Sequence, residues 1–291
     1  MVRATALDEK VRAFSLGGTA LVEELRGRHD TSPTVTAALG RTAMGALLLA
    51  AASLKEQHQL LTVDVRGDGP AGRILATANG AGEVRGMVGN AHAEAPSVTQ
   101  GKLNVAGVVG NSGYLSVTKD LGMREPYSGM VELQSGEIGD DLAHYLVRSE
   151  QTPSAVGIGV FVVPAGVVEA AGGFLIQLLP GLSESEIERI EGQIAALPHP
   201  TRLIRDGLSP EAVLQNIFGN DVDVLDRYPV TFSCPCSRER FRAAIVTLGV
   251  EEITRIIEEE EEERTEVVCH FCNEAYYFTA EQLQEIVEEA R

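Results

Sequence analysis

The sequence predicts an α+β protein: a layered β/α/β core domain with a buried central helix, then a helical linker, then a small zinc-binding α+β domain. Three observations predict this architecture. A stretch near the N-terminus is apolar on nearly all faces, residues 59–179 alternate apolar and polar side chains between turn residues, and all four cysteines form two tight pairs near the C-terminus. We expect the core domain to span residues 1–180, the linker 181–229 and the C-terminal domain 230–291.

Composition and charge exclude several classes of function. Hydrophobic residues make up 44 % of the 291-residue chain, which is typical of a folded globular protein. The formal net charge is −18, and residues 181–291 carry 24 acidic but only 10 basic side chains. Such a surface repels phosphate groups, so we expect neither a nucleic-acid nor a membrane partner. The longest apolar stretch, Thr42–Leu54, is shorter than the ~20 residues of a membrane span, and Met1–Lys10 lacks a signal-peptide core, so we predict a cytoplasmic protein.

The first part of the chain predicts the central helix. Val2–Leu16 alternates as an extended segment, and Thr19 is expected to cap a short helix. Ser32 followed by proline is a strong helix start, and the helix Pro33–Lys55 contains Arg41 as its only charged residue before the last position. A helix that is apolar nearly all round is buried on all sides, so we expect sheet against both flanks and a partner for Arg41.

The middle of the chain predicts short antiparallel strands. The hairpin signal Asn79-Gly80 separates two of them, and one helix at about Gly139–Ser149 interrupts the series. The predicted strands are Leu61–Val65, Arg73–Ala78, Glu83–Val88, Val105–Val109, Tyr114–Thr118, Met130–Gln134, Val156–Val163, Val167–Ala170 and Phe174–Leu179.

Residues 181–228 predict a helical segment with amphipathic faces. Ser183-x-x-Glu186 is a capping box, and Ser209-Pro210 starts a further helix that Gly219 ends. The first helix carries one apolar stripe, made of Ile187, Ile190, Ile194 and Leu197. Such a stripe must pack against something, most simply the preceding domain.

The last part of the chain is too small to rely on a hydrophobic core alone. Ser237 is expected to cap a helix, a second helix runs into the glutamates 258–263, and Thr279-x-x-Gln282 opens a terminal helix. A hairpin is expected around the second cysteine pair, with strands Thr265–Cys269 and Ala275–Phe278.

Cys234, Cys236, Cys269 and Cys272 predict a closed metal site. Two short pairs brought together in space give four thiolates, the ligand set of tetrahedral zinc, with iron as an alternative. Metal binding would contribute on the order of 10 kcal/mol to so small a domain. His270 and His199 are candidate extra ligands, although a histidine in a loop is more often simply exposed.

The same sulfurs can also support redox chemistry. A metal-bound thiolate still reacts with oxidants, and each pair is close enough in sequence to form its own disulfide. Four cysteines allow three pairings, and spacing alone does not choose among them. Two alternatives remain open from the residues: a static zinc-ribbon interaction module, which should carry a basic face, and a disulfide-exchange enzyme. We find no phosphate-binding glycine motif and no nucleophile elbow, so we predict no nucleotide partner and no enzyme activity.

The chain also resembles a known family, the bacterial thirty-three-kilodalton redox-regulated heat-shock chaperones. The resemblance rests on Cys234-Pro-Cys-Ser-Arg-Glu-Arg240 and Cys269-His-Phe-Cys-Asn-Glu274. Supporting stretches occur through the whole chain: Ala38-Leu-Gly-Arg-Thr42, Lys119-Asp-Leu-Gly122, Gly136-Glu-Ile-Gly-Asp-Asp141, Ser149-Glu-Gln151 and Gly172-Gly-Phe-Leu-Ile-Gln177.

The resemblance implies a function that spacing does not. It implies an ATP-independent holdase that binds unfolding client proteins under oxidative stress. In the reduced, inactive state the four cysteines would hold one Zn²⁺ per chain. Oxidation would join Cys234 to Cys236 and Cys269 to Cys272, release the metal, loosen the linker and favour a homodimer. The stripe Ile187, Ile190, Ile194 and Leu197 is then expected to be masked in the reduced form and available to clients after oxidation.

Overall fold

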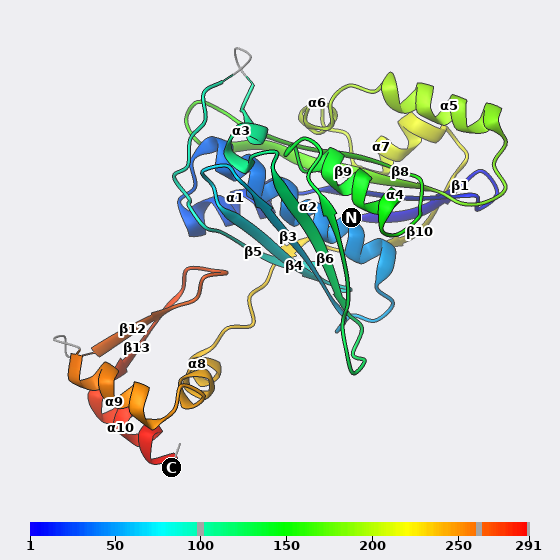
Figure 1. Cartoon of the computed structure of the whole chain (residues 1–291). Helices are drawn as coiled ribbons and strands as arrows, with labels where there is room; N and C mark the ends of the chain where they lie inside the picture. The colour runs from blue at the N-terminus through cyan, green and yellow to red at the C-terminus, as the bar shows by residue number, and fades with distance from the viewer. Residues whose placement is uncertain (98–101, 260–263, 290–291) are drawn as a thin grey trace. The chain divides into compact units, whose positions relative to one another are not determined.

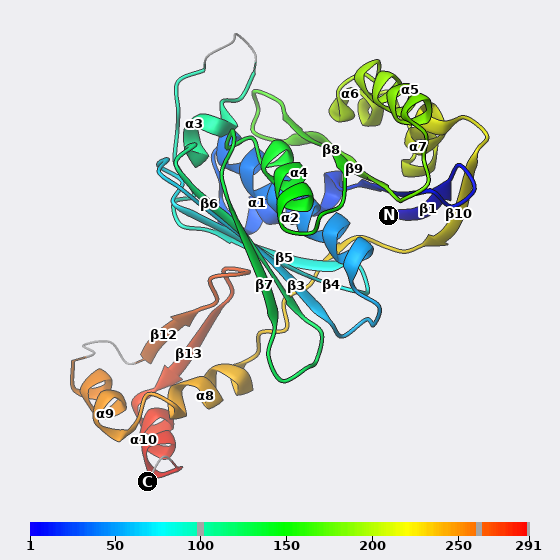
Figure 2. The ribbon, with the colours of Figure 1, turned by 45° about the vertical axis from the view of Figure 1, so that its right-hand side comes forward.

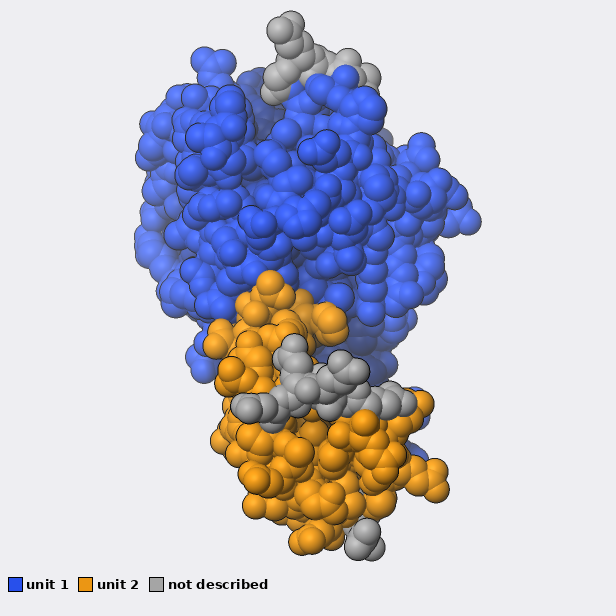
Figure 3. Space-filling model, turned by 90° about the vertical axis from the view of Figure 1, so that its left-hand side faces the viewer, with its two compact units in different colours: residues 1–233 blue, residues 234–291 orange. Residues whose placement is uncertain are grey.

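The computed structural model describes residues 1–97, 102–259 and 264–289. These residues form a mixed α+β structure, as the sequence predicts, and divide into two compact units, residues 1–233 and 234–291 (Figure 3). The run of glutamates covers residues 258–263, and its last four residues, 260–263, lie outside the described residues.

The first unit contains two sheets with helices between and beside them (Figure 1). One sheet has the spatial order β10 (Val222–Arg227), β1 (Val2–Ala6), β2 (Val11–Gly17), β9 (Val168–Leu178) and β8 (Ser154–Val162). The other has the order β11 (Thr231–Phe232), β5 (Glu83–Val88), β4 (Arg73–Asn79), β3 (Leu60–Gly67), β6 (Gly113–Asp120) and β7 (Tyr127–Glu132). Neighbouring strands are antiparallel except β11 and β5. The helices before the linker are α1 (Thr19–His29), α2 (Pro33–Ser53), α3 (Val105–Val109) and α4 (Gly139–Arg148).

Helix α2 packs against strands of both sheets (Figure 2). The Ser32 hydroxyl caps it by accepting a hydrogen bond from the Val35 N–H (3.4 Å), with Pro33 in the first turn. A Cβ at Gly45 would lie 2.4 Å from Leu142, so glycine permits the close approach of α4. By length and composition alone this helix is long enough to cross a membrane, which the expectation based on Thr42–Leu54 overlooked, but 94 % of its apolar window is buried inside the protein.

Several predicted elements differ from the structure. Val105–Val109 is a short helix and not a strand, because the Asn104 side chain caps it by accepting a hydrogen bond from Gly107 N–H (2.9 Å). The two strands predicted on either side of Gly172-Gly173 are one continuous strand, β9. The Thr19 hydroxyl does not cap α1. It instead accepts a hydrogen bond from the Ala171 N–H (3.0 Å) of β9.

Val2–Leu16 is not one extended segment but the hairpin β1–β2. Its turn is made by Leu7, Asp8 and Glu9, which all have positive φ (53°, 55° and 63°), and of these residue types only aspartate favours that conformation. The end of the predicted helical segment is also a strand, because Val222–Arg227 pairs with β1 at the edge of the sheet.

The linker helices belong to the first unit and pack with the sheet that contains β1, β2 and β9. They are α5 (Glu184–Ala195), α6 (Pro200–Arg205) and α7 (Pro210–Phe218). The predicted capping box at α5 is confirmed: Ser183 N–H donates to the Glu186 carboxylate (2.7 Å) and Glu186 N–H donates to the Ser183 hydroxyl (3.3 Å). The Ser183 N–H and the Ser183 hydroxyl (2.7 Å) both donate to the Glu186 carboxylate, which favours its ionised form and lowers the pKa of Glu186 to about 2. Helix α6 lies on β8 and β9, and α7 lies on β2.

The second unit is a small α+β structure with its own core. Its elements are α8 (Arg238–Val246), α9 (Val250–Glu259), β12 (Arg264–Val268), β13 (Ala275–Thr279) and α10 (Ala280–Glu289), with β12 and β13 paired as a hairpin. The predicted caps are present, because Ser237 caps α8 and Thr279 forms reciprocal hydrogen bonds with Gln282. Its buried core is small: Ile245, Ile253, Phe278, Leu283, Ile286 and Val287.

Candidate metal centre

The first cysteine pair lies immediately before helix α8. Cys234 and Cys236 are half-buried and lie in a segment without regular secondary structure. The Ser237 hydroxyl accepts a hydrogen bond from Arg240 N–H (3.2 Å), which fixes where the helix begins. The Arg240 side chain then donates back to the carbonyl of Pro235 between the two cysteines (2.8 Å). Helix capping therefore holds the first pair in a defined position.

The second pair lies in the turn of the β12–β13 hairpin. Cys269 N–H donates to the Glu274 carbonyl (2.9 Å), and the Cys269 carbonyl accepts from Cys272 N–H (3.3 Å) and Asn273 N–H (2.7 Å). Asn273 adopts a left-handed conformation with φ 62°, which asparagine tolerates better than most residues. This tight turn buries both sulfurs and directs them to the same side.

The four sulfur atoms form one cluster. All lie within 4.8 Å of one another, with 3.8 Å between the sulfurs of Cys234 and Cys269 and 3.2 Å between those of Cys236 and Cys272. A tetrahedral zinc ion with Zn–S bonds of ~2.3 Å separates its sulfur ligands by ~3.8 Å. The four side chains could therefore hold a metal ion with little movement.

The electrostatics of the cluster favour a cation. Burial raises the pKa of the Cys269 thiol and, more strongly, that of Cys272. Four thiolates so close together also repel one another, so the negative form requires a positive charge at the centre. A divalent cation supplies that charge, and the buried sulfurs give it soft ligands.

Tyr276 is a functional neighbour that the sequence reasoning missed. Its hydroxyl donates a hydrogen bond to the sulfur of Cys236 (3.3 Å), and its ring packs against Phe241 with centroids 5.0 Å apart. The signal was present in the strand alternation, because Tyr276 lies on the same side of β13 as the buried Phe278. A hydrogen bond to a ligand sulfur orients the ligand and tunes its charge.

Arg238 links helix α8, which follows the first cysteine pair, to the elements that follow the second pair. Its guanidinium donates to the carbonyl of Tyr277 and to the side chain of Gln282 (2.6 Å), and it lies 4.4 Å from the ring centroid of Phe278. One residue of α8 thus contacts both β13 and α10, which keeps the first cysteine pair next to the second.

Tyr276→Phe is expected to weaken metal binding by about tenfold, the lower end of the usual effect of losing a hydrogen bond to a ligand. The matched control is Tyr277→Phe, because the Tyr277 hydroxyl bonds to Glu266 (2.8 Å) and not to a cysteine. Zn²⁺ affinity measured in competition with a chelator checks the prediction. Equal affinities for the two variants would contradict it.

The other predicted site residues lie elsewhere. His270 is exposed and His199 belongs to the first unit, and neither is part of the sulfur cluster among the described residues. In the linker stripe Ile190 is 1 % exposed, while Ile194 and Leu197 are half-buried against the same apolar cluster. Half-buried Ile187 lines a shallow cavity with Leu178 and neighbouring residues.

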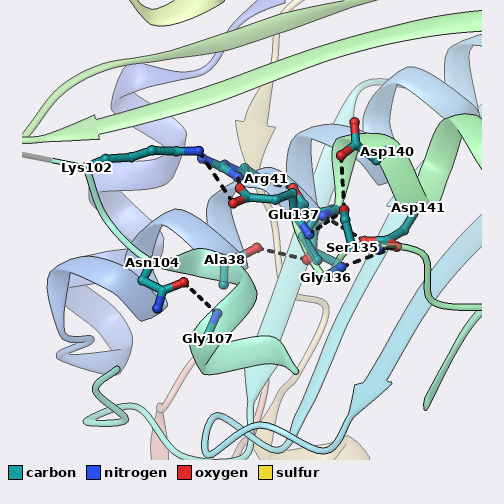
Figure 4. A network of polar contacts seen from close by, with 12 residues as sticks. Ala38, Arg41, Lys102, Asn104, Gly107, Ser135, Gly136, Glu137, Asp140 and Asp141 are labelled. Carbon is teal, nitrogen blue, oxygen red and sulfur yellow. Dashed lines mark hydrogen bonds and ion pairs between the residues drawn. The ribbon is translucent and has the colours of Figure 1, made fainter. Parts of the chain in front are cut away.

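The sequence predicts that Arg41 has a partner without naming it, and that partner is Glu137. The Arg41 Nη1 group donates to the Glu137 carboxylate (2.6 Å) and to its main-chain carbonyl (3.1 Å), as Figure 4 shows. The two residues are 96 positions apart, so no local pattern could have named the pair.

Comparison with known proteins assigns the family. A family model described as Hsp33 protein matches residues 1–279. The chain belongs to the Hsp33 family. It is 50 % identical to the 33 kDa chaperonin of Bacillus velezensis, over 99 % of this chain and 98 % of that protein. It is 49 % identical to the 33 kDa chaperonin of Bacillus subtilis, over 98 % of this chain and 96 % of that protein.

A solved structure agrees with the family assignment. The crystal structure of the 33 kDa chaperonin of Thermotoga maritima is 37 % identical, covers 99 % of this chain and 97 % of its own, and superposes with a TM-score of 0.89. Hsp33 relatives are named as chaperonins, so this chain falls in a family of chaperones and not of enzymes. The predicted family is thus confirmed, and the four clustered cysteines of this chain could bind a metal ion.

Proposed function

We propose that the chain is a redox-regulated, ATP-independent holdase that binds unfolding client proteins under oxidative stress. Family membership supports the chaperone, and the single observation that supports the switch is the cluster of four sulfurs within 4.8 Å in a unit with a very small core. In the reduced, inactive state Cys234, Cys236, Cys269 and Cys272 would together hold one Zn²⁺. When bound, zinc supplies positive charge and a fourfold cross-link.

Oxidation would convert the ligands into disulfides. We propose the pairs Cys234–Cys236 and Cys269–Cys272, which the family resemblance implies and which the mutual proximity of the sulfurs allows. Each pair of thiolates loses two electrons as the S–S bond forms, and one hydrogen peroxide accepts them together with two protons from solvent to give two water molecules. A disulfide sulfur is a poor metal ligand, so the oxidised chain would lose its cross-link.

The linker would respond to this loss. We propose the functional boundaries 1–180, 181–229 and 230–291, with the helices of the middle part packed on the sheet of residues 1–180 in the reduced state. The masked surface would be the stripe Ile187, Ile190, Ile194 and Leu197, whose partly buried position supports this role. Release of amphipathic helices exposes apolar surface to which unfolding clients bind, and we expect homodimers of the released form.

The closeness of α6 to the sheet offers a way to release the linker without oxidation. A Cβ at Gly159 of β8 would lie 2.6 Å from the ring of His199 and 2.7 Å from the methyl of Thr201. Gly159→Ala should therefore push α6 outward, at a cost of about 1–3 kcal/mol typical of overpacking.

We expect Gly159→Ala to speed amide exchange in residues 201–205 about tenfold or more, since 1.4 kcal/mol corresponds to a factor of ten. The reduced variant should also gain partial chaperone activity. Gly27→Ala is the matched control, because a Cβ there meets nothing within 4 Å. Unchanged exchange in α6 would show that the added methyl group fits against His199 and Thr201 without destabilising the helix. Faster exchange without chaperone activity would argue against a masking role for the linker.

The proposed function is tested by the aggregation of a heat-unfolded client, followed by light scattering without nucleotide. We compare the chain reduced with zinc and the chain treated with peroxide at raised temperature. Only the oxidised, zinc-depleted sample is expected to suppress scattering. Equal protection by both samples, or by neither, would favour the static zinc-ribbon module, in which the cysteines never leave the metal.

A further inference from the structure

The segment that leads to the first cysteine pair covers one edge of the six-stranded sheet. We call this segment, residues 228–233, the strap, and it contains β11. β11 has only two residues and pairs in parallel with β5, which has six. An uncovered strand edge accepts a further strand from another chain. The strap therefore occupies a position at which β5 could bind other extended polypeptide.

The main chain of the strap bonds to alternate carbonyl groups of this edge. Thr231 N–H donates to the Gly82 carbonyl (3.1 Å). Two residues further on, Ser233 N–H donates to the Val84 carbonyl (3.0 Å). This spacing is that of a parallel strand pair. Because these donors are main-chain groups, any extended chain without proline at these positions offers the same ones.

The next carbonyl along this edge is covered by a side chain. The Gly86 carbonyl accepts a hydrogen bond from Nε2 of His29, the last residue of α1 (2.9 Å). The edge of β5 is thus closed by one imidazole and by the strap, and both are far shorter than a full strand. Such short covers protect a sheet edge but are easily removed.

The side chains of the strap alternate between the core and solvent. Val230 and Phe232 are half-buried and pack against the main core, whereas Pro229 and Thr231 are exposed. The Arg28 guanidinium lies 4.4 Å from the ring centroid of Phe232, a favourable cation–π contact. The site beside β5 therefore fits an extended segment with apolar side chains at alternate positions, one of them aromatic.

We propose that the strap fills, in the reduced chain, a binding site for client segments. Once the strap leaves, an extended stretch of unfolded polypeptide with alternating apolar side chains adds to β5 as a parallel strand. An unfolded chain exposes both the main-chain donors and the apolar side chains, and a folded protein exposes neither together. The client role rests on the proposed function, whereas the strand-binding edge does not.

The position of the strap in the chain links it to the proposed switch. Ser233 is followed directly by Cys234, the first of the four clustered cysteines. Ends of ordered segments fray most readily, so unfolding of residues 234–291 loosens a strand of two residues. While those residues stay folded, the strap competes from within the same chain at an effective concentration on the order of millimolar. Clients at micromolar concentration then do not displace it.

A fluorescently labelled peptide with the sequence of residues 228–233 is the probe, and its anisotropy reports binding to the full chain. The oxidised chain is expected to bind it at least about tenfold more tightly than the reduced chain with zinc, because apparent affinity falls with the fraction of molecules whose site is open. A peptide N-methylated at the positions of Thr231 and Ser233 keeps the side chains but loses both donors. It should bind at least about tenfold more weakly.

A variant opens the edge without oxidant. Phe232→Ala removes the ring that anchors the strap and leaves β5 unchanged, so the reduced variant should bind the peptide at least about tenfold more tightly than the reduced chain does. Leu225→Ala is the matched control, because it shortens an apolar side chain of β10 that is 54 % exposed. It should leave the peptide affinity within about twofold.

The same peptide in excess should lower the protection that the oxidised chain gives to a heat-unfolded client. Each of four results would overturn the proposal: equal binding of the peptide and its N-methylated form, a gain for Phe232→Ala no larger than that for Leu225→Ala, no gain on oxidation, or full client protection at saturating peptide. Because the variant test uses neither client nor oxidant, a chain that is not a holdase can still bind the peptide. A holdase whose clients contact only the released helices would protect them without binding it.

Discussion

Removal of the metal from the reduced chain is expected to unfold residues 234–291 and to leave residues 1–180 folded. Metal binding to four thiolates contributes on the order of 10 kcal/mol, comparable with the whole stability of a domain. The second unit buries only a few large side chains, and chains below ~70–80 residues seldom fold on such a core alone. Amide exchange after chelation, resolved by peptide, measures both units in one sample.

A pair of variants separates ligand loss from local damage. Cys272→Ser removes one ligand and should unfold the second unit even with zinc present, since three sulfurs no longer close the site. His270→Ser changes an exposed side chain in the same turn and should leave the protection of the second unit unchanged. If chelated protein keeps full protection in α8 and α10, the hydrophobic core suffices and the cysteines are not what holds this unit together.

The second large effect is expected from Asp141→Ala in the first unit. The side chain of Asp141 is fully buried and accepts four main-chain hydrogen bonds. The donors are the N–H groups of Gln134 (2.7 Å), Ser135 (3.0 Å), Gly136 (3.4 Å) and Ile138 (2.9 Å). Removing the acceptor leaves these four donors buried without a partner. The expected loss of folding free energy is about 3–5 kcal/mol, as for other broken buried charge contacts.

The loop that Asp141 holds is also strained. Ile138 has φ 68°, a conformation that β-branched residues adopt rarely and at a cost, so the loop depends on its hydrogen bonds. Urea unfolding followed by circular dichroism measures the change in stability. The control is Asp140→Ala, because Asp140 is exposed and bonds only to the Ser135 hydroxyl (3.0 Å) among the described residues. Losses of similar size in both variants would show that the network is not what stabilises this loop.

Local signals predicted the parts of the structure that depend on neighbours in sequence. Capping residues located α2, α5, α8 and α10, and the cysteine spacing predicted the sulfur cluster because each pair occupies a single short loop. Val105–Val109 was misassigned because a short run of β-branched residues fits a strand and a buried helix equally well.

Long-range contacts could not be predicted in this way. Strand β10 follows helices and becomes a strand only because β1, at the other end of the first unit, offers an edge. The partner of Arg41 and the contact of Tyr276 with Cys236 depend on how distant segments meet. Sequence patterns predict the periodicity of a helix or strand, but they do not predict which distant segment packs or pairs with it.

Strand β10 makes the helical part of the linker a closed loop and not a tail. Residues 179–221 begin at the end of β9 and finish at β10, two strands of one sheet separated by β1 and β2, so the ends of the loop are about 14 Å apart at the usual strand spacing. If α5, α6 and α7 leave the sheet, both ends remain tethered, and the entropy gained is that of a loop and not of a free chain. A client held by this segment would stay within reach of the sheet edge, and its later release would leave the helices close enough to refold onto their original surface.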